Sequence, residues 1–207
     1  LVNGSPPGVY IWQLGRRLAI MMRNVLLICR IVVIVHRHFD SGEYNTQMDI
    51  RIGHGYDLHR LGSPAEGGKK MVIGGIIVES AIGPIAHSDG DAVMHAVTDA
   101  ILSAIGAPDL GTLFPDTLAD NKDRNSSEFL SDSVMRANEG GWVIGNIDVT
   151  VICDSPKIST YKEQICTSLH SLIGAPINIK GKTYEGTTKD SAIEVHAVAL
   201  VQRGKHT

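Results

Sequence analysis

The apolar positions of residues 71–202 recur with the periods of helices and strands in turn. Between residues 91 and 106 an apolar side chain returns every fourth position, which predicts a helix with one face against a core, ended by Gly106. These positions are Val93, Val97, Ile101 and Ile105. Between residues 146 and 153 the apolar positions alternate instead, which predicts a strand with one buried face.

Four more segments extend this pattern. Residues 125–141 and 160–173 predict helices that begin with capping boxes, formed by Asn125 with Glu128 and by Thr160 with Glu163. Strands are predicted at 177–183 and 194–202, and the apolar run 71–78 predicts a strand pair or a bent strand at its two glycines. Strands and helices therefore alternate in an α/β (α+β) domain without a long linker.

The first 48 residues differ from the rest in charge. Residues 1–39 contain five Arg, no Lys and no acid, so they carry +5, and because the whole chain carries −3 the remainder carries −8. The apolar stretch 18–35 is broken by Arg23 and Arg30, which predicts no stable membrane association. We interpret residues 1–48 as an N-terminal extension, either a targeting segment or untranslated or mis-spliced sequence, before a domain of residues 49–207.

Composition narrows the function further. The net charge of −3 gives no reason to expect a nucleic-acid partner. The three cysteines (29, 153 and 166) form no C-x-x-C pair and are odd in number, which favours a reducing compartment over a disulfide scaffold.

Two short clusters carry metal-ligating side chains. Asp57 and His59 lie two positions apart, so an extended chain points both to one side. In the second cluster His95 shares one side of the predicted helix with Asp91 and Asp99, which could orient its imidazole. Asp57, His59 and His95 together would form a three-ligand site with an open position, as at a catalytic zinc. Each histidine taken alone is more often an ordinary surface or core residue.

Three loops suit a phosphorylated substrate. Residues 109–117 combine acids with Gly and Pro in a loop of fixed shape, and residues 153–159 follow a strand and include Lys157. Residues 180–186 end another strand with Thr183 and Glu185. A diphosphate requires cations, hydroxyls and acids that hold divalent ions, although each loop alone could be a plain turn.

The order of these motifs resembles the family of 2-C-methyl-D-erythritol 2,4-cyclodiphosphate synthases of the non-mevalonate isoprenoid pathway. The motifs are GHGYDLH, AHSDGDAVMH, TDAIL, PDLGTLFPDT, IGNIDVTVI, SPKI, KTYE and AVAL, which run from about Arg51 to Arg203. The resemblance implies a homotrimer with a mixed β-sheet packed against helices and active sites between subunits. It also implies a lyase that cyclises 4-diphosphocytidyl-2-C-methyl-D-erythritol 2-phosphate and releases CMP.

Site residues follow from the matched motifs. The resemblance implies zinc on Asp57, His59 and His95, a second divalent cation (magnesium or manganese) on Glu185, and transition-state stabilisation by His87 and Thr183. It also implies substrate contacts from two further groups of residues. These are Ser88, Asp109, Leu110, Gly111, Phe114, Pro115, Asp116 and Thr117, with Cys153, Asp154, Ser155, Pro156, Lys157, Ile158 and Ser159 around the cytidine.

Some features depart from the family pattern. Leu118 stands where the family usually has Asp, and residues 186–192 are shorter than its Gly- and Arg-rich loop, with Lys189 as a substitute for the Arg that lines a central cavity. We therefore expect weak or no binding of isoprenoid diphosphates there. Lys182 before Thr183 resembles plant versions, which predicts a plastid or apicoplast-like organelle in a eukaryote and the cytoplasm otherwise. A zinc hydrolase with Asp89 as general base and an inactive binding or assembly relative are the alternatives.

Overall fold

The computed structural model describes residues 49–115, 117–118, 121, 123–187 and 191–203. In chain order these form β1 (Ile50–Gly62), a short 3-10 helix (Pro64–Glu66), β2 (Val72–Ile73), β3 (Ile76–Ile77), β4 (Gly83–Pro84), α2 (Ala92–Ile105), α3 (Leu110–Leu113), α4 (Ser126–Glu139), β5 (Trp142–Ile152), a second 3-10 helix (Ile158–Thr160), α5 (Lys162–Ile173), β6 (Ile177–Lys182) and β7 (Ala192–Arg203). The predicted extension 1–48 and the cavity residue Lys189 lie outside the described residues, so those predictions stay open.

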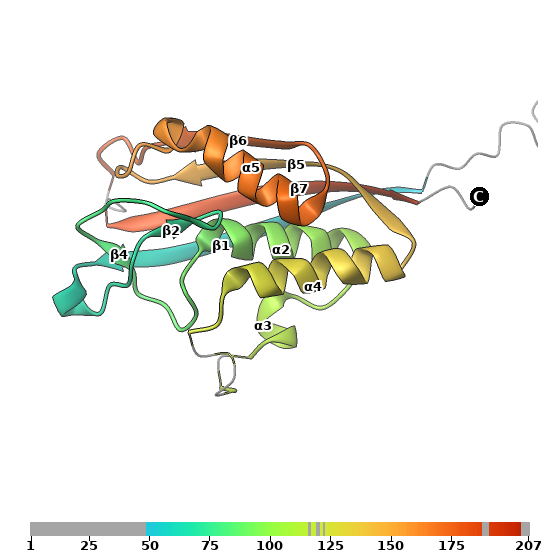
Figure 1. The fold of residues 1–207 in the computed structure, drawn as a ribbon, viewed down its shortest axis with the longest axis horizontal. Helices are drawn as coiled ribbons and strands as arrows, with labels where there is room; N and C mark the ends of the chain where they lie inside the picture. The colour runs from blue at the N-terminus through green and yellow to red at the C-terminus, as the bar shows by residue number, and fades with distance from the viewer. Residues whose placement is uncertain (1–48, 116, 119–120, 122, 188–190, 204–207) are drawn as a thin grey trace, which may run out of the picture. The chain divides into compact units, whose positions relative to one another are not determined.

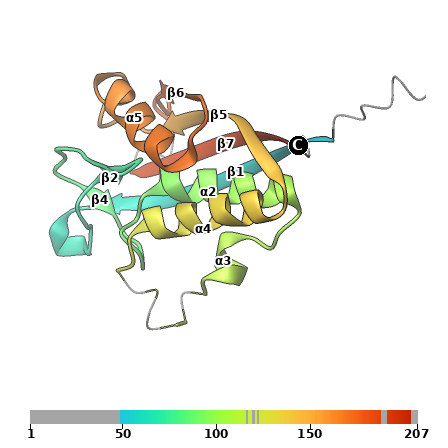
Figure 2. The ribbon, with the colours of Figure 1, turned by 45° about the vertical axis from the view of Figure 1, so that its right-hand side comes forward.

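Five strands form one sheet in the order β4-β1-β7-β5-β6. β5 and β6 run parallel, while β1 and β5 both pair with β7 antiparallel. The helices α2, α4 and α5 all lie on one side of this sheet, as Figures 1 and 2 show. The prediction of a mixed sheet packed against helices is therefore confirmed.

Most predicted elements form, but their ends differ in detail. Gly106 ends α2 in the left-handed conformation, as the pattern predicted, and Asp91 caps its start, which the pattern did not predict. Residues 71–78 form the β2–β3 hairpin. The capping box at Thr160 is wrong: Thr160 belongs to a 3-10 helix, and α5 begins at Lys162 without a side-chain cap.

Helix α2 approaches β1 closely because two glycines face it. A Cβ on Gly53 would stand 2.0 Å from the carbonyl oxygen of Ala100, and one on Gly55 would stand 1.8 Å from that of Ala96. Neither distance leaves room for any side chain. The helix backbone thus lies directly on the strand, which brings His95 to the segment of β1 that follows the glycines.

The strand β1 was not predicted from its sequence, because its apolar side chains are exposed while glycines occupy positions that face the helices, the reverse of the usual alternation. Its inner positions include Gly53 and Gly55, while the large apolar side chains of the strand point away from the helices. The face of the sheet opposite the helices exposes Ile50, Ile52, Tyr56 and Leu58 of β1 with Val143 of β5 and Val198 of β7. We call these six residues the open face. No described element covers it.

Candidate metal centre and adjoining pocket

The three predicted metal ligands meet at the interface of β1 and α2. Oδ2 of Asp57 lies 3.1 Å from Nδ1 of His95 and 3.5 Å from Nδ1 of His59. One ligand atom from each residue lies within 4.8 Å of the other two. Because Asp57 and His59 are two apart on a strand, both point toward the helix, where His95 completes the trio. The sequence-based prediction that these residues come together is confirmed.

The chemistry of the trio fits a metal ion. Nε2 of His59 is buried and has no hydrogen-bond partner among the described residues, a state that costs free energy unless a ligand or ion satisfies it. Burial lowers the pKa of His95, but the hydrogen bond and charge of Asp57 and the charges of Asp91 and Asp89 outweigh it and leave that pKa raised. The site therefore favours positive charge. Two imidazoles and one carboxylate are the ligand set of an open, catalytic type of zinc site.

Two serines hold the far nitrogen of His95. Its Nε2 lies 2.8 Å from Oγ of Ser126 and 3.2 Å from Oγ of Ser88. The Ser126 hydroxyl donates in turn to Asp89, so its oxygen is free to accept from the Nε2–H group of His95. This arrangement leaves Nδ1, which faces Asp57, as the nitrogen available to a metal.

The acids predicted to orient His95 have other partners. Asp91 is fully buried and accepts hydrogen bonds from the backbone of Gly74, Gly75, Val93 and Met94. Asp99 accepts from the backbone N–H of Leu110 at 2.7 Å. The prediction that these two carboxylates orient His95 is therefore wrong, because both accept hydrogen bonds from backbone N–H groups instead. Ser126, which the sequence reading missed, carries that role, and no local pattern around it signals this.

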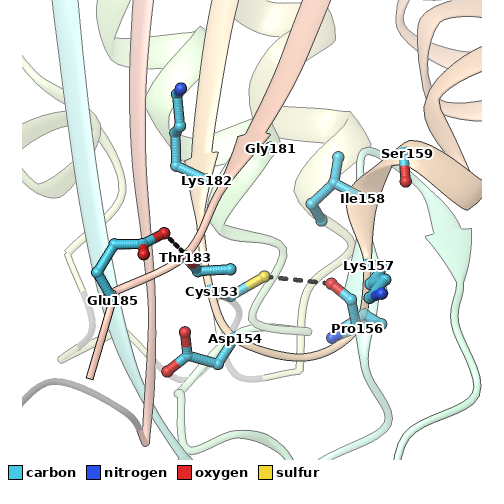
Figure 3. Close-up of a pocket in the computed structure, with 10 residues that line it drawn as sticks. All are labelled: Cys153, Asp154, Pro156, Lys157, Ile158, Ser159, Gly181, Lys182, Thr183 and Glu185. Carbon is cyan, nitrogen blue, oxygen red and sulfur yellow. Dashed lines mark hydrogen bonds between the residues drawn. The ribbon is translucent and has the colours of Figure 1, made fainter. Parts of the chain in front are cut away.

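A separate pocket forms where β5 and β6 end. Because the two strands are parallel, the loops that follow them meet at one edge of the sheet. The pocket has a volume of about 310 Å³. Its lining residues are Cys153, Asp154, Pro156, Lys157, Ile158, Ser159, Gly181, Lys182, Thr183 and Glu185. Figure 3 shows Thr183 and Glu185 on one side, with Lys157 and Ser159 across from them.

The pocket is built from polar groups on a rigid frame. The Thr183 hydroxyl donates to the Glu185 carboxylate, and Asp154 accepts from the backbone N–H of Tyr184 at 2.9 Å, which ties the two loops together. Burial raises the pKa of the Cys153 thiol to about 11, so the thiol stays protonated at neutral pH. The pocket therefore offers hydroxyls, a carboxylate and lysine ammonium groups, and no activated thiolate.

Of the remaining predicted residues, Ser88 and Phe114 lie near the metal centre. Ser88 touches His95, and His87 immediately precedes it on the same loop. Asp109 caps the short helix α3, which includes Leu110 and Gly111, by accepting from the backbone of Thr112. The Phe114 ring packs on Phe129 with centroids 4.8 Å apart, and Phe129 in turn contacts His95. Pro115 follows in this loop and Thr117 is exposed, while Asp116 lies outside the described residues.

Within one chain the pocket and the metal centre stay separate. The pocket lining shares no residue with the trio of Asp57, His59 and His95, although all of them were predicted to serve one reaction. Glu185, the predicted ligand of a second cation, belongs to the pocket. The predicted site is thus present as two parts in the described chain.

Comparison with known proteins identifies the family. The model of the YgbB family matches residues 50–202. The chain is 41% identical over 175 residues to the chloroplastic 2-C-methyl-D-erythritol 2,4-cyclodiphosphate synthase of Arabidopsis thaliana, an alignment that covers 82% of this chain and 74% of the relative. It is 43% identical over 156 residues to the Hydrogenobaculum synthase, with 74% of this chain and 97% of the relative covered.

Solved structures agree. IspF of Plasmodium falciparum in complex with CDP matches with a TM-score of 0.65 and 33% identity over 75% of this chain and 97% of that one. A CDP-bound 2C-methyl-D-erythritol-2,4-cyclodiphosphate synthase matches with a TM-score of 0.67 and 36% identity over 73% of this chain and 99% of that one. Motif order, fold and the three-residue centre all point the same way, and the chain belongs to the 2-C-methyl-D-erythritol 2,4-cyclodiphosphate synthase family.

Proposed function

We propose that the chain converts 4-diphosphocytidyl-2-C-methyl-D-erythritol 2-phosphate to 2-C-methyl-D-erythritol 2,4-cyclodiphosphate with release of CMP. The observation that carries this proposal is the trio of Asp57, His59 and His95 in a chain that also has the polar pocket of Thr183 and Glu185. The reaction is a phosphoryl transfer within one substrate, which needs alignment and charge neutralisation more than covalent chemistry. A protonated Cys153 is consistent with that requirement.

Each part of the site has a proposed task. Asp57, His59 and His95 would hold zinc, and Glu185 would hold magnesium or manganese. Bound cations supply polarisation of phosphoryl oxygens and neutralisation of their charge. His87 and Thr183 donate hydrogen bonds to the reacting phosphates, and Lys157 adds a positive charge. The loop of residues 153–159 binds the cytidine, and two solved relatives are complexes with CDP.

We propose a homotrimer whose active sites lie between subunits. Two observations support it. The open face gathers six exposed apolar side chains on one surface, which is typical of a protein interface. The pocket and the metal centre also share no residue in one chain, so a neighbouring subunit could bring the pocket of one copy to the metal centre of another.

The zinc hydrolase is the less favoured alternative. Its proposed general base, Asp89, already accepts hydrogen bonds from the backbone of Asp91 and from the backbone and hydroxyl of Ser126. A carboxylate so engaged is a structural support and a poor proton acceptor. The structure does not support the other alternative, an inactive binding or assembly relative, since the three candidate ligand side chains are present and close together.

We further propose that the protein acts in a plastid. Relatives in Arabidopsis thaliana and Oryza sativa are named chloroplastic. The basic residues 1–39 are consistent with a targeting segment before the matched region. No described helix has the length and apolar character needed to cross a membrane.

CMP release tests the proposed activity. Purified protein receives the cytidyl 2-phosphate substrate with zinc and magnesium, with zinc alone, and after treatment with a chelator. We expect full CMP release only with both ions, and none from the same substrate lacking the 2-phosphate, because that group is the nucleophile. Release of cytidine monophosphate from the substrate without its 2-phosphate would instead indicate hydrolysis.

A further inference from the structure

The residue Lys69 lies outside every predicted motif, yet its side chain joins three segments. Its backbone N–H donates to the carbonyl oxygen of Pro84 at 3.0 Å, which fixes it beside β4. Its ammonium donates to the carbonyl oxygen of His87 at 3.1 Å, to that of Ser88, and to the carboxylate of Asp123 at 2.7 Å. The side chain is only 29% exposed. One ammonium therefore links the loop that precedes α2 with the turn that precedes α4.

The same two segments are also joined by backbone hydrogen bonds. The N–H of Asp123 donates to the carbonyl of His87 at 2.9 Å, and the N–H of Asp89 donates to the carbonyl of Arg124 at 3.2 Å. The carbonyl of His87 thus accepts from two donors, one of them charged. Asp123 itself has a φ of 57°, a left-handed conformation that is unfavourable for most side chains. Its contact with Lys69 helps to hold the turn in that conformation.

The ammonium acts on the metal centre through the adjacent loop. Two carbonyl dipoles converge on one nitrogen. Without the positive charge their negative ends would repel each other, the Ser88 carbonyl would lose its described donor, and the His87 carbonyl would keep only the N–H of Asp123. The peptide between His87 and Ser88 would then turn. That movement would take the Ser88 hydroxyl away from Nε2 of His95, 3.2 Å distant, and from the N–H of Gly90, also at 3.2 Å. Asp57 and His59 stand on β1 and would not move with it.

We propose that Lys69 is a positioning residue of the synthase site, which holds His87 and Ser88 in the orientation that the reaction requires. This inference rests on the proposed roles of His87 and Ser88. It differs from a metal-binding role, because Lys69 touches none of the three ligands. It also differs from a general effect of surface charge, because the neighbouring Lys70 is exposed and joins none of these segments in the described contacts.

The experiment compares Lys69→Met with the matched control Lys70→Met, which removes the same charge one position away. We expect kcat of Lys69→Met to fall roughly tenfold to a hundredfold, since small misplacements of reacting groups have effects of this size. KM should change less, because the loop of residues 153–159 is untouched. Zinc content should stay at the level of the unaltered protein, and Lys69→Arg should recover part of kcat because a guanidinium also donates to several acceptors.

Hydrogen exchange gives a readout that is independent of activity. The amides of Asp89 and Asp123 should exchange faster in Lys69→Met than in Lys70→Met, because these amides join the two segments. If the unaltered protein released no CMP, the proposed function would fail while the exchange measurement still tested Lys69. Equal kcat and equal exchange in the two Met variants would overturn the inference. Loss of zinc and of folded protein in Lys69→Met, without recovery in Lys69→Arg, would also overturn it and show a structural role.

Discussion

At the scale of single residues, the metal centre depends on contacts beyond its three ligands. Ser126 holds Nε2 of His95 and is itself held by Asp89 through both its hydroxyl and its backbone N–H. This series of hydrogen bonds favours the His95 tautomer with its proton on Nε2, which leaves Nδ1 facing Asp57 without a proton. The residue that orients a ligand is therefore as much a part of the site as the ligand.

Replacement of Ser126 tests that support. Ser126→Ala should weaken zinc binding by roughly 10- to 100-fold, the usual effect of losing a partner behind a metal ligand, while His95→Ala should weaken it further. Competition with a chelator of known affinity measures the zinc affinity. Ser127→Ala is the matched control, since its described contacts are made by its backbone. Equal zinc affinity in both serine variants would remove Ser126 from the centre.

The ionisation of Cys153 provides a pH-dependent test. Burial and the nearby Asp154 raise the pKa of this thiol from 9.0 to about 11, so alkylation of the folded protein should become appreciable only as the pH nears 11. The thiolate is disfavoured only in the folded state, so this group should reduce folding stability as the pH rises from 9.0 through 11. The half-buried Cys166 is the internal comparison and should be alkylated faster, because more of it is exposed. Rapid alkylation of Cys153 at neutral pH, measured by mass spectrometry of its peptide, would contradict a protonated thiol.

At the scale of elements, the contact between β1 and α2 decides where the ligands stand. The helix can approach the strand only because glycines face the carbonyl oxygens of Ala96 and Ala100. Asp57 and His59 continue the same inner face of β1 beyond these glycines. The metal centre is thus set by a strand and a helix and does not depend on a flexible loop.

A methyl group on Gly55 should disturb this contact. Because its Cβ would stand 1.8 Å from the carbonyl oxygen of Ala96, we expect Gly55→Ala to lower the free energy of unfolding by at least about 1–3 kcal/mol. Zinc affinity should fall as well, since the helix that carries His95 must move. Gly111→Ala serves as the control for folding, because its nearest contact would be 3.9 Å away. If urea unfolding gave the same free energy of unfolding for both variants, α2 would be able to move away from β1 without loss of stability.

At the scale of the whole molecule, the open face is the main exposed apolar surface of the sheet, and β1 contributes four of its six residues. A sheet that bears large apolar side chains on both faces needs a partner on each, and the described chain supplies helices for one only. A homotrimer would cover the other. The proposed homotrimer would also explain why one chain contains the candidate metal centre and the pocket as separate parts.

A charge on the open face tests the homotrimer. Ile52 and Ile77 are both 69% exposed, but Ile52 lies on the open face of β1 and Ile77 on the β2–β3 hairpin. We expect Ile52→Lys to dissociate the trimer and abolish CMP release, because the lysine would be buried without a partner at the interface. Ile77→Lys should leave both unchanged. Sedimentation measures the assembly, and a trimer that survives Ile52→Lys with full activity would place the interface elsewhere.

The sequence alone predicted most of the helices and strands after residue 70, and it singled out the three candidate metal ligands. Val93, Val97 and Ile101 reveal α2 because helical period is a local property, and Asp57 with His59 reveals a ligand pair because alternation in a strand is local too. Only the tertiary structure decided which groups support those ligands. Ser126 reaches His95 across 31 positions, Lys69 reaches Asp123 across 54, and Gly55 matters through a helix 41 residues away. Spacing along a chain specifies neighbours on one element, whereas these contacts join different elements and exist only once the chain has packed.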